Sequence, residues 1–391
     1  MTREGLGRAR RVVVKLGSLV LTTASGVLDR GVFEGLAHDV AELRRRGLDV
    51  TIVSSGAVAA GIGRLGLGER PATIPEIQAV AAVGQINLVW LYKQVFGARG
   101  LPVGQVLLTR DDLENRRRYQ NAKQALMAMF RMGIVPVVNE NDTVVVDEIK
   151  FGDNDNLSAM VTNLVEADAL VLLTDTEGLY DRDPKVHPDA RLVESVESVD
   201  EAVARFVGSS VSRCGTGGMA TKLLAAKLAT HGGAAVVIAS GKVPNALLRI
   251  LRGERLGTYF PPKADRLRRR KHWIAYTAKP MGRVRIDAGA VRALVEGGKS
   301  LLPKGIVGVE GAFDRGEAVS VVGPSGEEVA RGLVAYSADE TRQIAGLASW
   351  EIADRLGYKY GDEVIHRDDL VVLLPGETFR RGDEGPETGD W

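Results

Sequence analysis

Short runs of β-branched and other apolar residues alternate with longer helical patterns through the first 260 or so residues of the chain. Between the runs, apolar positions recur with the spacing of one helix face. Such alternation is typical of a mostly parallel sheet with helices on both faces, so the expected fold class is α/β. The runs that indicate strands are 12–14, 50–53, 103–108, 134–138, 169–173 and 235–239.

Polar clusters directly follow four of these runs. In parallel sheets of this kind, ligands gather beyond the carboxyl ends of the strands. The sequence therefore predicts a ligand-binding crevice at that edge. The four clusters are Lys15 to Ser18, Ser54 to Gly56, Asn139 to Asp142, and Thr174 with Asp175.

The segment from Gly215 to Lys222 is rich in glycine and ends at the start of a predicted helix. Free backbone N–H groups, a helix N-terminus and an ammonium together bind anions, and a nucleotide phosphate is the obvious one. The alternative is a flexible surface loop. Only three residues separate Gly218 from Lys222, so this is not the P-loop pattern. Lys15, at the first strand end, would supply the second cation that phosphoryl transfer needs.

Carboxylates and amides are dense in two segments, 139–142 and 152–156. Such groups can bind a zwitterionic amino acid, and carboxylates can also hold Mg²⁺. A simpler interpretation is Asx-rich turns and a helix cap, with Asp155 or Asn156 capping a helix that begins near Leu157. A single cap would not account for both segments. Thr174 and Asp175 could likewise contact a nucleotide or form only a turn.

Composition excludes several classes of protein. A length of 391 residues fits two domains, and a net charge of +1 provides no field that would attract nucleic acid or an anionic membrane. No uninterrupted apolar run approaches membrane length, and Lys15 breaks the first run too early for a signal peptide. Cys214 is the only cysteine, so no internal disulfide can form and a cytoplasmic location is expected.

The pattern changes near residue 261. Two prolines open a stretch with four consecutive cations at 268–271, which we interpret as a linker with solvated charges rather than an RNA-binding patch. Short apolar runs with glycine-rich turns then predict a small β-barrel-like module. The polar end of the chain is expected to be disordered. The runs are 284–286, 305–309, 318–322 and 332–336, and the expected regions are 8–260, 261–279, 280–374 and 375–391.

Seven motifs occur along the chain in the order VVVKLGS, IVSSGAVAAG, AAVGQ, VVNEND, FGDNDNLSA, LLTDTEGLY and GTGGMATK. Their sequences and order resemble those of the glutamate 5-kinases of the amino-acid kinase family. A later segment, KSLLPKGIVGVEGAFDRGEAV, resembles the PUA module of bacterial members. The resemblance covers about residues 10–372. It implies an amino-acid kinase fold over 8–260 and a PUA domain over 280–374.

The resemblance also implies an activity. Members of this group phosphorylate the side-chain carboxylate of L-glutamate with ATP and Mg²⁺, giving L-glutamyl 5-phosphate in the first step of proline biosynthesis. A homo-oligomer, inhibition by proline and a functional partnership with glutamyl phosphate reductase are further expectations. RNA binding by the PUA module stays open. The residues suit this chemistry, because a carboxylate acceptor is already ionised at neutral pH and needs no general base.

Roles for individual residues follow from the resemblance. Lys15 and Lys222 would bind phosphates and stabilise the transferred group, with Asp155 orienting both lysines. Glutamate would be bound by Ser55, Asp142 and Asn154, supported by Asn139 and Asp153. The ATP site would be lined by Lys15, Thr174, Asp175, Thr216, Gly217, Gly218, Met219, Ala220, Thr221 and Lys222. No residue is assigned as a metal ligand.

Two alternatives compete with this interpretation. A kinase of the same fold could act on aspartate, N-acetylglutamate or UMP, but the GDNDN motif and the PUA-like segment argue against these acceptors. An RNA-binding or RNA-modifying protein should have a basic, aromatic surface, which the charge of +1 and the 5% aromatic content do not favour.

Overall fold

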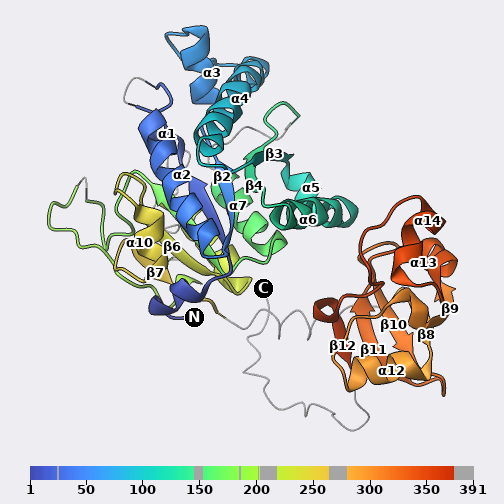
Figure 1. Cartoon of the computed structure of the whole chain (residues 1–391). Helices are drawn as coiled ribbons and strands as arrows, with labels where there is room; N and C mark the ends of the chain where they lie inside the picture. Colours follow the sequence, from blue (N-terminus) through green and yellow to red (C-terminus); the bar gives the residue numbers. More distant parts are fainter. Residues whose placement is uncertain are drawn as a thin grey trace, which may run out of the picture. The chain divides into compact units, whose positions relative to one another are not determined.

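The computed structural model describes residues 1–23, 26–144, 153–184, 186–200, 202, 218–263 and 280–373, without the side chains of Arg116 and Asp153. The chain divides into two compact units, Met1–Arg266 and Leu267–Trp391. In Figure 1 the first unit runs from blue to yellow and the second is orange to red. Several predictions from the sequence concern residues outside the described ones, among them Cys214, most of the linker, its cation run at 268–271 and the tail 375–391.

The first unit is built on a seven-stranded sheet in the order β3-β4-β2-β1-β5-β6-β7. Neighbouring strands are parallel except at β7, which runs antiparallel to β6. Every run from 12 to 239 that indicated a strand forms one, whereas β7 had no signal in the sequence. The strands are β1 (Arg11–Leu16), β2 (Asp49–Ser54), β3 (Val103–Leu108), β4 (Val135–Glu140), β5 (Ala169–Thr174), β6 (Ala235–Ser240) and β7 (Thr258–Phe260).

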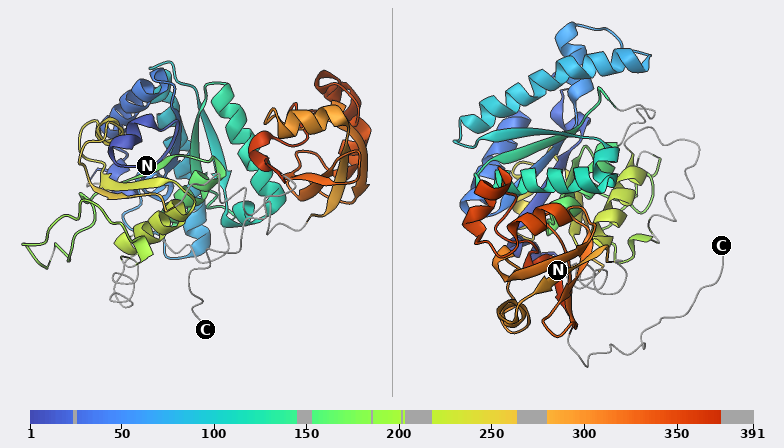
Figure 2. Two further views of the ribbon diagram at one scale, coloured as in Figure 1. Left: turned by 90° about the horizontal axis from the view of Figure 1, so that it is seen from below. Right: turned by 90° about the vertical axis from the view of Figure 1, so that its right-hand side faces the viewer.

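Helices cover both faces of this sheet, and successive side chains of β1 alternate between the two cores. Val12 and Val14 join one apolar core, while Val13 joins the other. Figure 2 gives two further views of these layers. The first core is covered by α2 (Arg30–Arg45), α4 (Ile74–Gly97) and α10 (Ala246–Leu251), and the second by α6 (Arg116–Arg131), α7 (Asp153–Leu164) and α9 (Met219–His231). Shorter helices are α1 (Ser18–Leu21), α3 (Ala57–Leu65) and α5 (Arg110–Glu114).

Helices α3 and α4 touch backbone to backbone. A Cβ atom added to Gly84 of α4 would lie 1.7 Å from the carbonyl oxygen of Ala57, and one added to Gly61 of α3 would lie 2.0 Å from that of Val80. Helix α3 follows the turn at Gly56, whose φ of 100° favours glycine. The absence of side chains at these two glycines therefore allows α4, which carries the AAVGQ motif, to pack against the turn that follows β2.

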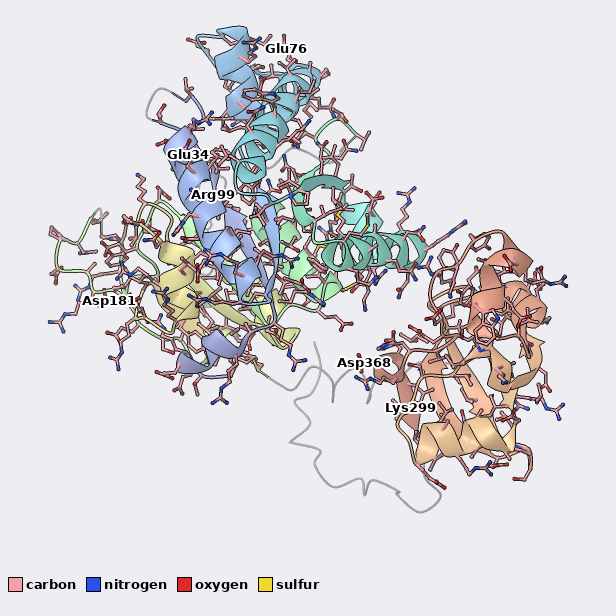
Figure 3. All side chains as sticks on the ribbon, in the orientation of Figure 1. Glu34, Glu76, Arg99, Asp181, Lys299 and Asp368 are labelled. Atoms are coloured by element: carbon pink, nitrogen blue, oxygen red, sulfur yellow. The ribbon has the colours of Figure 1, made fainter. Side chains whose placement is uncertain are left out.

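Helix α4 is anchored on its other side by α2. The guanidinium of Arg99, just beyond α4, donates to the carbonyl oxygen of Glu34 on α2 at 3.4 Å, and both residues are labelled in Figure 3. Leu88 and Tyr92 of α4 are fully buried. By length and composition alone, α4 could also cross a membrane, with 24 residues and a mean hydropathy of 1.2. No uninterrupted apolar run of that length exists in α4, because polar residues such as Gln85 and Lys93 lie within it. A single helix of this kind says little, because core helices share these properties.

The second unit has its own core and a five-stranded sheet in the order β12-β11-β10-β8-β9. The described ladder does not close into a barrel. The predicted strand at 332–336 is wrong in its bounds, because β11 ends at Leu333. The elements are β8 (Gly282–Ile286), α12 (Ala288–Val295), β9 (Ile306–Gly311), β10 (Ala318–Val322), β11 (Glu328–Leu333), α13 (Ala338–Ile344), α14 (Ile352–Leu356) and β12 (Leu370–Val372).

Candidate active site

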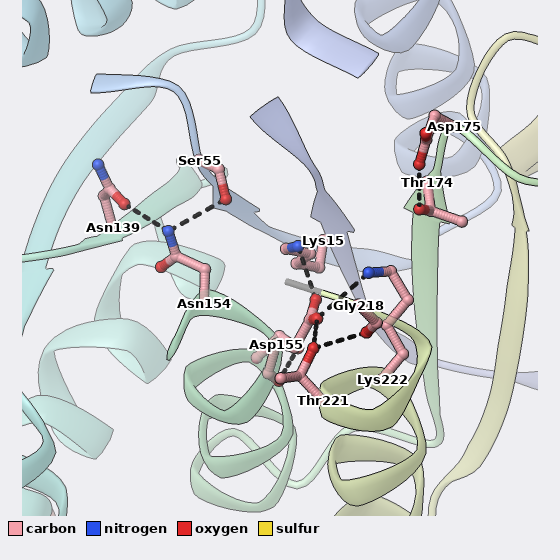
Figure 4. A network of polar contacts seen from close by, with 11 residues as sticks. Lys15, Ser55, Asn139, Asn154, Asp155, Thr174, Asp175, Gly218, Thr221 and Lys222 are labelled. Atoms are coloured by element: carbon pink, nitrogen blue, oxygen red, sulfur yellow. Dashed lines mark hydrogen bonds and ion pairs between the residues drawn. The ribbon is translucent and has the colours of Figure 1, made fainter. Parts of the chain in front are cut away.

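Three charged side chains meet at the carboxyl end of the sheet (Figure 4). Nζ of Lys15, near the end of β1, lies 2.6 Å from Oδ1 of Asp155 in the first turn of α7. Nζ of Lys222, in the first turn of α9, lies 3.4 Å from Oδ2 of the same carboxylate. Thr221 also donates its hydroxyl to this oxygen at 2.7 Å. We call Lys15, Asp155 and Lys222 the lysine centre.

The lysine centre is buried and carries a surplus positive charge. Asp155 has no exposed surface and each lysine is 6% exposed. Burial lowers the pKa of Lys15, although Asp155 opposes that shift. Burial alone would raise the pKa of Asp155, but Lys15 and Lys222 together hold that pKa below its ordinary value. Two ammonium groups facing one carboxylate favour the entry of an anion.

The structure corrects the interpretation of Asp155 or Asn156 as a helix cap. Helix α7 begins at Asp153, not near Leu157, so both residues lie inside its first turn. The Asp155 carboxylate contacts the two lysines and Thr221 instead. A cap contributes about 1 kcal/mol, which is less than the cost of leaving two buried ammonium groups without a counter-charge.

Three of the predicted glutamate-binding residues meet in one cluster beside the lysine centre. Nδ2 of Asn154 donates to Oγ of Ser55 and to Oδ1 of Asn139, both at 3.1 Å. The remaining oxygen, Oδ1 of Asn154, is buried and finds no partner among the described residues. Because Asn154 and Asp155 are consecutive on α7, one helix turn joins this amide cluster to the lysine centre (Figure 4).

Asp142 lies in a different setting from the amide cluster. It lines a pocket of about 380 Å³ together with residues of α4, β3 and the segment after β4. Burial raises the pKa of Asp142 to about 6. The pocket also includes Gln85, which connects it to Asn139.

The predicted ATP-site residues are described only in part. The hydroxyl of Thr174, at the end of β5, donates to Oδ1 of Asp175 at 3.0 Å, and Figure 4 draws this pair apart from the lysine centre. Residues 218–222 are described, with Gly218 directly before α9 and the others in its first turn. The predicted start of a helix at the end of the glycine segment is thus confirmed. Thr216, Gly217 and the side chain of Asp153 lie outside the described residues.

Two residues of α4 contact the site without having been predicted. Oε1 of Gln85 accepts from Nδ2 of Asn139 at 2.7 Å, and the hydroxyl of Tyr92 donates to Oγ of Ser54 at 2.9 Å. They lie seven residues apart, so they share one helix face with the buried Leu88. In the sequence, the signal for these two contacts was the presence of polar groups on an otherwise apolar helix face.

Comparison with known proteins places the chain in a family. The model of the amino acid kinase family matches residues 10–240, and that of the PUA domain matches 282–356. The chain belongs to the amino acid kinase family. Within it, a glutamate 5-kinase of Geobacter sp. (strain M21) is 54% identical over 95% of this chain and 100% of its own length. Those of Trichlorobacter lovleyi (52%; 95% and 99%) and Thermoanaerobacter sp. (strain X514) (48%; 94% and 99%) are similarly close.

The chain is therefore a member of the glutamate 5-kinase group of the amino acid kinase family, as its motifs indicated. Membership of this kinase family implies that ATP is used and that a divalent metal is typically required. Among the described residues, no group of three His, Cys, Asp or Glu side chains could hold a metal ion. Both oxygens of Asp155 are already engaged by Lys15, Lys222 and Thr221.

Proposed function

We propose that this chain transfers the γ-phosphoryl group of ATP to the side-chain carboxylate of L-glutamate at the lysine centre, giving L-glutamyl 5-phosphate and ADP. This is the first step of proline biosynthesis. Membership of the glutamate 5-kinase group supports the reaction. The observation that carries the assignment of the site is the junction at Asn154 and Asp155, where an amide cluster suited to an amino acid adjoins a buried cationic centre suited to phosphate.

Lys15 and Lys222 are proposed to neutralise charge on the transferred group, and Asp155 to keep their two ammonium groups in place. Such fixed charges act most strongly in the transition state, where charge spreads over the phosphoryl oxygens. Gly17 supports this role, because a Cβ atom there would lie 3.8 Å from Nζ of Lys15. A side chain at this position would occupy space beside the ammonium that a phosphate needs.

ATP is proposed to place its phosphates at the N-terminus of α9, where backbone N–H groups of residues 218–220 have no partner within the helix. Thr174, Asp175, Thr216 and Gly217 complete the proposed nucleotide site. Mg²⁺ would enter as part of the MgATP substrate, held mainly by phosphate oxygens and water.

Glutamate is proposed to bind between Ser55, Asn154 and Asp142, with Asn139 and Asp153 in support. The buried, unpartnered Oδ1 of Asn154 is an acceptor suited to the α-ammonium group, and the Asp142 carboxylate supplies an opposite charge. No general base is required, since the attacking carboxylate is ionised at neutral pH. Catalysis then depends on aligning two anions and neutralising their charge.

Four further expectations belong to this proposal: a cytoplasmic location, a homo-oligomer, inhibition by proline, and consumption of the product by glutamyl phosphate reductase. Proline is a cyclic relative of glutamate, so we expect inhibition that weakens as glutamate rises. Exposed apolar side chains on α4 favour assembly, since Ile86 is 73% and Trp90 57% exposed.

The function is tested by measuring ADP release with a panel of acceptors, and by trapping the acyl phosphate with hydroxylamine. Glutamate should support turnover, whereas aspartate, N-acetylglutamate and UMP should not. ATP hydrolysis indifferent to glutamate, or faster turnover with another acceptor, would overturn the proposal. A mobility shift of labelled RNA without any glutamate-dependent ADP release would favour the RNA-binding alternative.

A further inference from the structure

The orientation of the Asn139 side chain is determined by its neighbours. The backbone N–H of Glu140 donates to Oδ1 of Asn139 at 2.9 Å. A backbone N–H can only donate, so this contact identifies the oxygen end of the amide. The NH₂ end of Asn139 therefore points to Oε1 of Gln85, at 2.7 Å.

The same contacts determine the orientation of Asn154. Oδ1 of Asn139 also accepts from Nδ2 of Asn154, at 3.1 Å, and Nδ2 in turn reaches Ser55. Oδ1 of Asn154 is consequently the end that remains for a ligand. A row of amides, from Gln85 through Asn139 to Asn154, thus leaves an acceptor where the proposed substrate carries its ammonium group.

Gln85 accepts the hydrogen bond from the NH₂ end of Asn139, whereas the backbone N–H of Glu140 fixes the oxygen end. Asn139 is only 2% exposed, so its NH₂ group would lose its partner without becoming accessible to water if the oxygen of Gln85 were removed. An unpartnered buried donor is costly, and rotating the Asn139 amide would replace that donor by its oxygen at the vacated position. Rotation would turn the one NH₂ group of Asn139 toward both the Glu140 N–H and Nδ2 of Asn154. Asn154 would then have to turn as well and present NH₂ to the substrate's ammonium group.

We propose that Gln85 is a positioning residue for the amino-acid acceptor. Its side-chain oxygen keeps Asn139, and through it Asn154, in the orientation that accepts a hydrogen bond from the α-ammonium group. Gln85 acts through these two residues without touching the reacting atoms. The inference rests on the proposed function. Gly61 and Gly84 are part of the same arrangement, because they allow the close approach of α3 and α4, and Gln85 directly follows Gly84 on α4.

Two variants of Gln85 test the proposal in the full-length protein. Gln85→Met removes the acceptor oxygen at nearly constant size, and the KM for glutamate should rise on the order of tenfold, with kcat and the KM for ATP within about twofold. Gln85→Glu keeps an oxygen for Asn139, and its KM for glutamate should stay within about threefold of the original. Gln94→Met makes the same chemical change at an exposed position of α4 and should alter none of the three constants.

Glutarate separates positioning from general damage, because it carries both carboxylates of glutamate but lacks the amino group. Its inhibition constant against glutamate should change less than twofold in Gln85→Met. A parallel loss for glutamate and glutarate, a Gln85→Glu variant as impaired as Gln85→Met, or a normal KM for glutamate in Gln85→Met would each overturn the inference. If the unaltered chain does not phosphorylate glutamate, the proposed function fails instead, and the glutamate assay of that chain identifies this outcome first.

Discussion

The ammonium nitrogen of Lys15 lies 2.6 Å from Oδ1 of Asp155, and neither side chain is more than 8% exposed. With Lys222 on the other oxygen, this buried group has two cations and one anion. Buried charges are costly when they lack partners, so the surplus positive charge favours a ligand that brings negative charge. The arrangement therefore favours the binding of an anion, of which phosphate is one.

Replacing Lys15 should affect turnover more than substrate affinity. Lys15→Ala should lower kcat on the order of 10²-fold or more, with a much smaller change in the KM for glutamate, because a fixed cation is needed most in the transition state. Steady-state kinetics on protein with a native-like circular dichroism spectrum measures both constants. Lys93→Ala, at an exposed position of α4, is the control. Near-normal turnover in folded Lys15→Ala would contradict the assignment.

Removing Asp142 should weaken glutamate binding selectively. Asp142→Ala takes away the carboxylate in the pocket next to Gln85, so the KM for glutamate should rise much more than the KM for ATP. Isothermal titration of each substrate provides an independent measurement. Equal losses for the two substrates would point to a structural or Mg²⁺-related role for Asp142.

The pKa of Asp142, raised by burial to about 6, predicts opposite effects on activity and stability. As pH falls through about 6, Asp142 gains a proton, and kcat/KM for glutamate should fall. In Asp142→Asn, kcat/KM for glutamate should not show this fall as the pH decreases. The pKa of Asp142 is higher in the folded chain than the value near 3.9 expected in the unfolded chain, so ionisation of Asp142 opposes folding above about pH 4. Asp142→Asn should therefore raise the free energy of unfolding at pH 7 by about 1–2 kcal/mol. The gain should disappear below about pH 4. Thermal unfolding across pH checks this, and an unchanged stability at pH 7 would argue against the raised pKa.

The close contact of α3 and α4 predicts a strong effect at Gly84. An added Cβ would meet the carbonyl oxygen of Ala57 at 1.7 Å, so Gly84→Ala should lower the free energy of unfolding by about 1–3 kcal/mol or more. Affinity for glutamate should fall with it, since Gln85 would move. Gly97→Ala at the end of the same helix has nothing within 4 Å and should be neutral or slightly stabilising. Chemical denaturation of both variants gives the comparison, and equal stabilities would mean that the helices can separate without cost.

Local patterns were sufficient for much of this architecture. Strands β1 to β6 contain short runs that are mostly apolar, so they could be located from residues alone, and residues at strand ends such as Lys15 could be expected at one edge. The pairing of Lys15 with Lys222 was expected from the two cations that phosphoryl transfer needs, whereas the place of Asp155 between them was implied only by the family resemblance. Strands β7 and β12 have three residues each, too few for a periodic signal.

The contacts of Gln85 and Tyr92 could not be predicted from local patterns. They depend on how α4 lies against the ends of β4 and β2, and its close contact with α3 at Gly61 and Gly84 is part of that packing. Likewise, Asp155 looked like a helix cap because capping is a local preference. In the structure, two ammonium groups from distant parts of the chain determine its role instead.

The boundary of the catalytic unit gives a last prediction. A chain that ends at Arg266 keeps β7 and should retain glutamate-dependent turnover, because every proposed site residue lies before it. A chain that ends at Leu256 loses β7. In that strand Thr258 and Phe260 are fully buried, and the Thr258 hydroxyl accepts a hydrogen bond from the backbone N–H of Leu179 at 2.8 Å. Removing that strand uncovers apolar core and leaves a buried donor without its partner, so the shorter chain should fail to fold. Circular dichroism, size-exclusion chromatography and turnover distinguish the two. A folded but inactive chain ending at Arg266 would show that the second unit takes part in catalysis.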